Sequence, residues 1–220
     1  MSWHRPYRGY LFDLDGTLID TAPDLCRAQN AALAQHGFEP ASEADTRHWV
    51  GHGARVLLQK AIAAQRDIPV PETQLDAMHA EFLTYYQDNI AVASQVYPEV
   101  ISTLNTLAER GAQLAVVTNK LEGLSRVLLD AIQMSGHFDL LIGGDTAGVA
   151  KPAADPAQLA CKTLGLEADE VLFVGDSTTD VGCARAFGCP VVCVSYGYSQ
   201  GVPANELGAD GVIDSFAALL

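Results

Sequence analysis

The sequence has little that would cross-link it, anchor it or attract a polyanion. Its five cysteines include no CxxC pair, so we expect reduced thiols, no disulfide framework and a reducing compartment, the cytoplasm. No apolar run approaches the ~18 residues that cross a membrane, and the stretch MSWHRPYRGY lacks the apolar centre of a signal peptide. Basic residues are scarce, with 13 Lys and Arg against 27 Asp and Glu and a net charge of −14. We therefore expect neither nucleic acid nor a membrane among the partners.

Histidines at the spacing of metal ligands are also scarce. Only His48 and His52 stand four residues apart in a helical pattern, and we favour a solvated or packing role for them over a zinc site. The acidic excess leaves a small anionic substrate open, because one bound metal ion can invert the local field.

The chain carries no internal repeat, and short apolar runs alternate with helical patterns along most of it. Strands are predicted at 9–14, 112–118, 138–144, 170–176, 190–195 and 211–214, and helices near 99–110, 121–133, 156–164, 178–187 and 203–208. Asp155 and Pro156 mark a helix start, and Gly111, Gly165 and Gly188 follow helix ends. This alternation predicts an α/β fold with a doubly wound parallel sheet.

The interval 20–95 breaks the alternation. Thr21 and Asp24 have the spacing of a capping box, the helix that they open ends at Gly37, and helical patterns follow near 43–49, 53–65 and 72–90 without a convincing strand. We expect an all-helical domain, 20–95, inserted into a core of 1–19 and 96–220. Its links to the core would be 18–22 and 92–98.

Polar residues follow several predicted strands at the edge where parallel sheets bind ligands. Taken singly, each has an ordinary explanation as a tight turn, a helix cap or a solvated lysine. Their joint occurrence in this order favours a site. They are Asp13, Asp15, Gly16 and Thr17 after the first strand, Thr118, Asn119 and Lys120 after the next, Lys151 in a later loop, and Asp176, Ser177 and Asp180.

Two carboxylates one residue apart, Asp13 and Asp15, need compensation for their charge. A hard divalent cation, Mg²⁺, provides it through the carboxylates of Asp13 and Asp176 and a backbone carbonyl near Asp15. Such a cation keeps positions open for a phosphate. Thr118 and Lys151 would then bind that phosphate, and the turn at 16–17 would bring backbone N–H groups to the anion.

The stretches DLDGTL, VVTN, KP and GDSTTD resemble, in order and spacing, the four motifs of the haloacid dehalogenase superfamily. The resemblance implies a Rossmann-like core with a helical cap and a phosphatase that acts through an aspartyl-phosphate. It makes Asp13 the nucleophile and Asp15 the general acid and base. It assigns Mg²⁺ to Asp13, Asp176 and the Asp15 backbone oxygen, with Ser177 and Asp180 in support. An aspartate at position 15 favours a phosphatase or mutase over a dehalogenase.

The stretches at 47–61 and 143–152 and the sequence GYGYSQG are similar to parts of phosphoglycolate phosphatases. This similarity makes 2-phosphoglycolate the leading substrate. Its carboxylate could pair with Arg47 or Arg55 and with the backbone N–H groups at Gly51 and Gly53, with Asn119 a further candidate. The apolar residues between them could instead simply pack the helical domain.

Other small sugar phosphates, amino-sugar phosphates and pyrophosphate remain open as substrates. So do a β-phosphoglucomutase-like isomerase and, as a different class, a binding protein without turnover. Ala154 departs from a common Lys-Pro-x-Pro pattern, which could loosen the loop that holds Lys151. We expect a small phosphorylated metabolite as partner and a monomer or homodimer.

Overall fold

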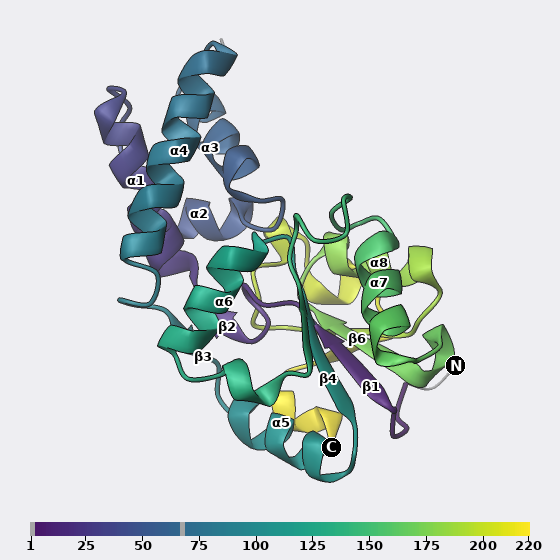
Figure 1. Cartoon of the computed structure of the whole chain (residues 1–220). Coiled ribbons are helices and arrows are strands. Elements are labelled where there is room, and N and C mark those ends of the chain that lie inside the picture. Colours follow the sequence, from purple (N-terminus) through teal and green to yellow (C-terminus); the bar gives the residue numbers. More distant parts are fainter. Residues whose placement is uncertain (1–2, 67–68) are drawn as a thin grey trace.

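The computed structural model describes residues 3–66 and 69–220, so the first two residues of the stretch considered for a signal peptide lie outside it. A six-stranded sheet forms its centre, in the order β5-β4-β1-β6-β7-β8, and all the pairings within it are parallel (Figure 1). The predicted doubly wound α/β class is therefore confirmed. The strands are β1 (Gly9–Phe12), β4 (Gln113–Val117), β5 (Leu140–Ile142), β6 (Val171–Gly175), β7 (Val191–Val194) and β8 (Gly211–Ile213).

The central strand β1 is buried along its whole length, as its apolar sequence predicts. Tyr10 and Phe12 face one core cluster with α5 (Val100–Glu109) and α6 (Glu122–Ala131). Leu11 faces the opposite cluster with α7 (Asp155–Leu164) and α8 (Thr178–Phe187). Helices thus cover both faces of the sheet (Figure 1).

Four helices, α1 to α4 in chain order, pack on one another beyond one end of the sheet (Figure 1). They are α1 (Ala22–Gln35), α2 (Glu43–Trp49), α3 (Ala54–Ala63) and α4 (Glu72–Asp88). Two short strands, β2 (Ile19–Asp20) and β3 (Gln95–Val96), pair antiparallel where the chain enters and leaves this helical region. No strand was predicted there, because two residues are too few to show an alternating pattern.

The start of α1 differs from the predicted capping box. Thr21 stands at the N-cap position, but its side chain makes no capping hydrogen bond. Its hydroxyl instead donates to Asp15 Oδ1 at 2.6 Å. Asp24 accepts hydrogen bonds from the backbone of Ala93 and Ser94, at the other end of the helical region. The capping-box prediction is wrong because tertiary partners take both side chains.

Other helix boundaries follow the sequence signals closely. Gly165 and Gly188 have φ values of 68° and 93° at the C-caps of α7 and α8. Asp155 is the first residue of α7 rather than its cap. The helix expected over 203–208 is a short 3₁₀ turn, Ala204–Glu206.

The cysteines are buried and free, as expected of core thiols. Within residues 3–66 and 69–220, no helix combines the length and the apolar character that crossing a membrane requires.

Candidate active site

The carboxyl ends of β4, β1 and β6 lie side by side in the sheet. The chain runs outward from β1 to β4 and β5 and then crosses to β6 on the other side, which makes β1 the topological switch point. Asp13, Thr118 and Asp176 each follow one of these three strands. The fold therefore brings together polar residues that are far apart in the sequence.

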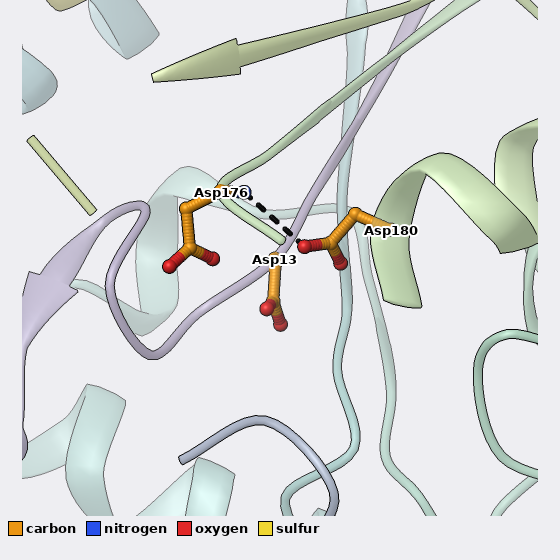
Figure 2. A group of neighbouring side chains, drawn as sticks. All are labelled: Asp13, Asp176 and Asp180. Carbon is orange, nitrogen blue, oxygen red and sulfur yellow. Dashed lines mark hydrogen bonds between the residues drawn. The ribbon is translucent and has the colours of Figure 1, made fainter. Parts of the chain in front are cut away.

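Asp13, Asp176 and Asp180 form a buried acidic cluster (Figure 2), in which one carboxylate oxygen of each lies within 4.8 Å of the others. Asp180 completes a capping box with Ser177 at the start of α8, where it accepts from the backbone N–H groups of Asp176 and Ser177. Its carboxylate is thus already engaged. Asp13 and Asp176 are the members best able to hold a metal.

Lys151 is the cation of this cluster. Its ammonium donates to Asp180 Oδ1 at 2.6 Å and to the Val117 carbonyl at 2.8 Å. It also lies 2.8 Å from Asp13 Oδ1, with which it forms an ion pair. Burial lowers the pKa of Lys151, but Asp13 and Asp180 more than offset it and raise the pKa above its ordinary value. Lys151 is held firmly without a proline at position 154.

The cluster is short of positive charge. Burial raises the pKa of Asp13 to about 6, against the opposing effect of Lys151. Burial and its acidic neighbours raise the pKa of Asp176 well above its ordinary value. Three buried carboxylates that one lysine cannot neutralise fit a hard divalent cation.

The turn after β1 positions Asp176. Gly16 has a φ of 87°, and a Cβ there would lie 2.5 Å from Asp176 Oδ2, so the close approach requires glycine. The Thr17 hydroxyl donates to Asp176 Oδ1 at 3.2 Å, and the backbone N–H of Tyr198 donates to Oδ2 at 2.6 Å. Gly16 and Thr17 therefore both contact the carboxylate of Asp176.

Asp15 has partners that the sequence did not indicate. The ammonium of Lys120 lies 2.9 and 3.0 Å from its two carboxylate oxygens. Lys120 is buried, with its Nζ 4.6 Å from the centre of the Tyr86 ring on α4. Burial lowers the pKa of Lys120, but interaction with Asp15 and Tyr86 raises it above its ordinary value. The only sequence signal was its place two residues after Thr118, at a strand end.

A cavity of about 210 Å³ lies between the sheet end and the helical region. Its sheet side holds the polar residues Asp13, Asp15, Thr118, Asn119 and Lys120. Its helical side is mostly apolar, with Leu57, Phe82, Leu83 and Tyr86 among the lining residues. The cavity is small and holds its reactive groups at one end.

The candidates in the helical region separate into two groups. Gly51, Gly53 and Arg55 line the cavity, whereas Arg47 is not among its lining residues. Arg47 instead donates to Asp20 at 2.7 Å and to Glu43 at 2.9 Å. Arg55 is paired with Glu72 and Asp76.

Asn119 ties the two regions together. Its amide donates to the Gly51 carbonyl at 2.8 Å and to the Lys151 carbonyl at 3.0 Å, and its Oδ1 accepts from the Lys151 N–H. The side chains of His48 and His52 have different partners, the Ala44 carbonyl and Gln200, so they do not act as a ligand pair.

The chain is similar in sequence to known proteins. A family model of haloacid dehalogenase-like hydrolases matches residues 10–194. A phosphoglycolate phosphatase of Rhodospirillum rubrum is 41% identical over 215 residues, which cover 96% of this chain and 89% of that protein. One of Caulobacter vibrioides is 43% identical over 205 residues, with 93% and 86% covered.

Solved structures give the same result. The crystal structure described as a predicted phosphoglycolate phosphatase from Haemophilus somnus matches with a TM-score of 0.92 at 35% identity. The match covers 98% of this chain and 97% of that one. The similarity thus includes both the sheet and the helical region.

Proposed function

The chain belongs to the haloacid dehalogenase-like hydrolase family, and on that premise we propose that it is a magnesium-dependent phosphatase of small phosphomonoesters. One observation carries the proposal. Asp13 presents a buried carboxylate 2.8 Å from the ammonium of Lys151, and the cavity that Asp13 lines also holds a second carboxylate, Asp15. This arrangement suits a nucleophile and a proton carrier acting on one phosphoester.

The reaction has two steps. A carboxylate oxygen of Asp13 attacks phosphorus, the bond from phosphorus to the ester oxygen breaks, and Asp15 gives its proton to the leaving alcohol. Water then attacks the phosphorus of the aspartyl-phosphate, Asp15 takes a proton from it, and Asp13 is regenerated as inorganic phosphate leaves. Thr118 and Lys151 bind the phosphoryl oxygens and stabilise the charge that they carry.

Asp13, Asp176 and the backbone oxygen of Asp15 are the groups that would hold Mg²⁺. When bound, Mg²⁺ supplies charge neutralisation for the carboxylates and for the phosphoryl oxygens. Asp180 supports the site by fixing Lys151 and the start of α8. Ser177 helps by donating to Asp180 at 2.7 Å.

The helical region, residues 20–95, acts in this proposal as a cap on a core of 1–19 and 96–220. The antiparallel pair β2 and β3 lies within the proposed links, 18–22 and 92–98, and joins the entry and exit of the cap. Closure of the cap on the sheet would exclude water during transfer to Asp13 and admit one molecule afterwards.

The substrate that we propose is 2-phosphoglycolate, because relatives that match nearly the whole chain carry that name. A cavity of about 210 Å³ supports a small leaving group. We expect the partner to be this metabolite rather than nucleic acid or membrane, in the reducing cytoplasm that five free thiols suit.

Phosphate release by the purified protein tests the proposal. The substrates are 2-phosphoglycolate, p-nitrophenyl phosphate, an amino-sugar phosphate and pyrophosphate, each with Mg²⁺ and with excess EDTA. We expect release that EDTA abolishes and that is most efficient with 2-phosphoglycolate. Release from no substrate would support a binding protein, and phosphate transfer between sugar positions without release would support a mutase.

A further inference from the structure

We propose that the ammonium of Lys120 binds the carboxylate of the leaving group and so selects 2-phosphoglycolate. This inference rests on the proposed function and deepens it. It gives the role of carboxylate recognition to the core of the protein rather than to Arg47 or Arg55 of the helical region.

The cavity has few cations to offer a carboxylate. Arg55 lines it but pairs with Glu72 and Asp76 on the outside of the helical region, and its side chain is 34% exposed. Burial lowers the pKa values of the two lining histidines, His52 and His79, which disfavours their charged forms. Lys120 has a side chain only 5% exposed, and it lines the cavity beside Asp13 and Asp15.

The position of Lys120 matches the chemistry of the substrate. Asp15 must contact the leaving oxygen in order to protonate it, and Lys120 Nζ lies 2.9 and 3.0 Å from the carboxylate oxygens of Asp15. In 2-phosphoglycolate only one methylene separates the leaving oxygen from the carboxylate. When the leaving oxygen contacts Asp15, the carboxylate of the same leaving group therefore lies close to Lys120 Nζ.

The surroundings of Lys120 make the contact selective. The Tyr86 ring lies 4.6 Å from Nζ, and Leu57, Phe82 and Leu83 line the helical side of the cavity. A carboxylate in this apolar surrounding depends on the ammonium for its charge compensation. An ammonium has three N–H donors, so it can bind a ligand while it keeps a hydrogen bond to Asp15.

The test compares two substrates of nearly equal size and leaving-group chemistry, 2-phosphoglycolate and 2-hydroxyethyl phosphate. We expect wild type to prefer the carboxylate. In Lys120→Met and Lys120→Gln the ratio of the two kcat/KM values should fall by at least about tenfold, the value of one buried charge-assisted hydrogen bond. Lys162→Met, which removes an exposed lysine on α7, should leave the ratio unchanged.

Equal losses on both substrates would overturn the inference and leave Lys120 as a positioning residue for Asp15 alone. A wild type without preference for 2-phosphoglycolate would instead refute the proposed substrate, which distinguishes the two failures.

A second measurement leaves Lys120 in place, in case its variants do not fold. The Asp13→Asn variant, titrated with 2-phosphoglycolate, should show a shift of the Lys120 side-chain NMR signal that 2-hydroxyethyl phosphate does not cause. The same shift with both ligands would overturn the inference.

Discussion

At the scale of single residues, the site brings several acidic side chains together where they are buried. Asp13, Asp176 and Asp180 lie together, the Lys151 ammonium pairs with Asp13 and Asp180, and burial raises the pKa values of Asp13 and Asp176. Such a cluster costs stability when no cation is bound, because ionised carboxylates lose their hydration. The acidic cluster therefore lowers the stability of the metal-free protein, and the same carboxylates provide the ligands for a metal ion.

Asp13→Asn should stabilise the metal-free protein at neutral pH. The folded-state pKa of Asp13 is raised to about 6 from 3.8, so wild-type stability falls as pH rises from about 4 to 6 and stays lower above that. The variant lacks this loss. We expect a gain in the free energy of unfolding on the order of 1–3 kcal/mol at pH 7 and almost none at pH 4.

Chemical denaturation in EDTA at both pH values measures this gain. A gain of equal size at pH 4 and pH 7 would show that the titration of Asp13 is not its cause.

Asp176→Asn should weaken metal binding while it keeps the shape of the side chain. We expect the Mg²⁺ concentration for half-maximal activity to rise by at least about tenfold, because a hard cation loses one of few carboxylate ligands. Asp88→Asn, at an exposed acid near the end of α4, is the matched control for net charge. An unchanged Mg²⁺ requirement in Asp176→Asn would remove this residue from the metal site.

The sequence predicted the site residues that directly follow strands. Asp13, Asp15, Thr118 and Asp176 were predicted to meet because parallel strands end at one edge. Lys120 was placed at a strand end but was given no role, because its side chain contacts Asp15 and Tyr86 through packing between distant segments. Position in the sequence says little about side-chain contacts between distant segments.

At the scale of elements, the start of α1 shows how a loop can replace local capping. The Tyr198 hydroxyl accepts from the backbone N–H groups of Thr21 and Ala22, at 2.8 Å each, and donates to Asp20 at 2.9 Å. The backbone of the same residue holds Asp176. One tyrosine thus joins the first link of the helical region to the acidic cluster. The capping-box prediction failed because local spacing cannot reveal a partner so far along the chain.

Tyr198→Phe should destabilise the protein, since two buried N–H donors lose their acceptor. We expect a loss of about 2–4 kcal/mol in the free energy of unfolding, measured by denaturant titration. Tyr7→Phe is the matched control, because the buried Tyr7 hydroxyl has no hydrogen-bond partner among residues 3–66 and 69–220. Equal stabilities of the two variants would contradict the capping role of Tyr198.

At the scale of the whole molecule, polar contacts join the helical region to the loops that follow the strands. The Asn119 amide donates to the Gly51 carbonyl, and the Gln200 amide donates to the Val50 carbonyl at 3.3 Å. The sequence predicted the helical insertion and its links from the break in alternation. The arrangement of the insertion over the sheet depends on these side-chain contacts, for which the sequence has no pattern.

Gln200→Ala should loosen the contact between Gln200 and the turn at 50–53 without unfolding the protein. We expect faster amide hydrogen exchange at 50–53, by a few-fold, and little change in global stability, because only contacts at the rim are lost. Gln87→Ala, at an exposed glutamine on α4 whose side chain has no hydrogen bond in the described chain, is the control. Unchanged exchange at 50–53 would show that Gln200 does not hold the turn.

Phosphate release by Asp13→Asn tests whether Asp13 is the nucleophile of a phosphatase. The variant and wild type are compared on 2-phosphoglycolate and p-nitrophenyl phosphate in saturating Mg²⁺, after denaturation curves have shown that both are folded. We expect a loss of at least about a thousandfold on both substrates. A folded Asp13→Asn protein that releases phosphate at a rate comparable with wild type would contradict the account.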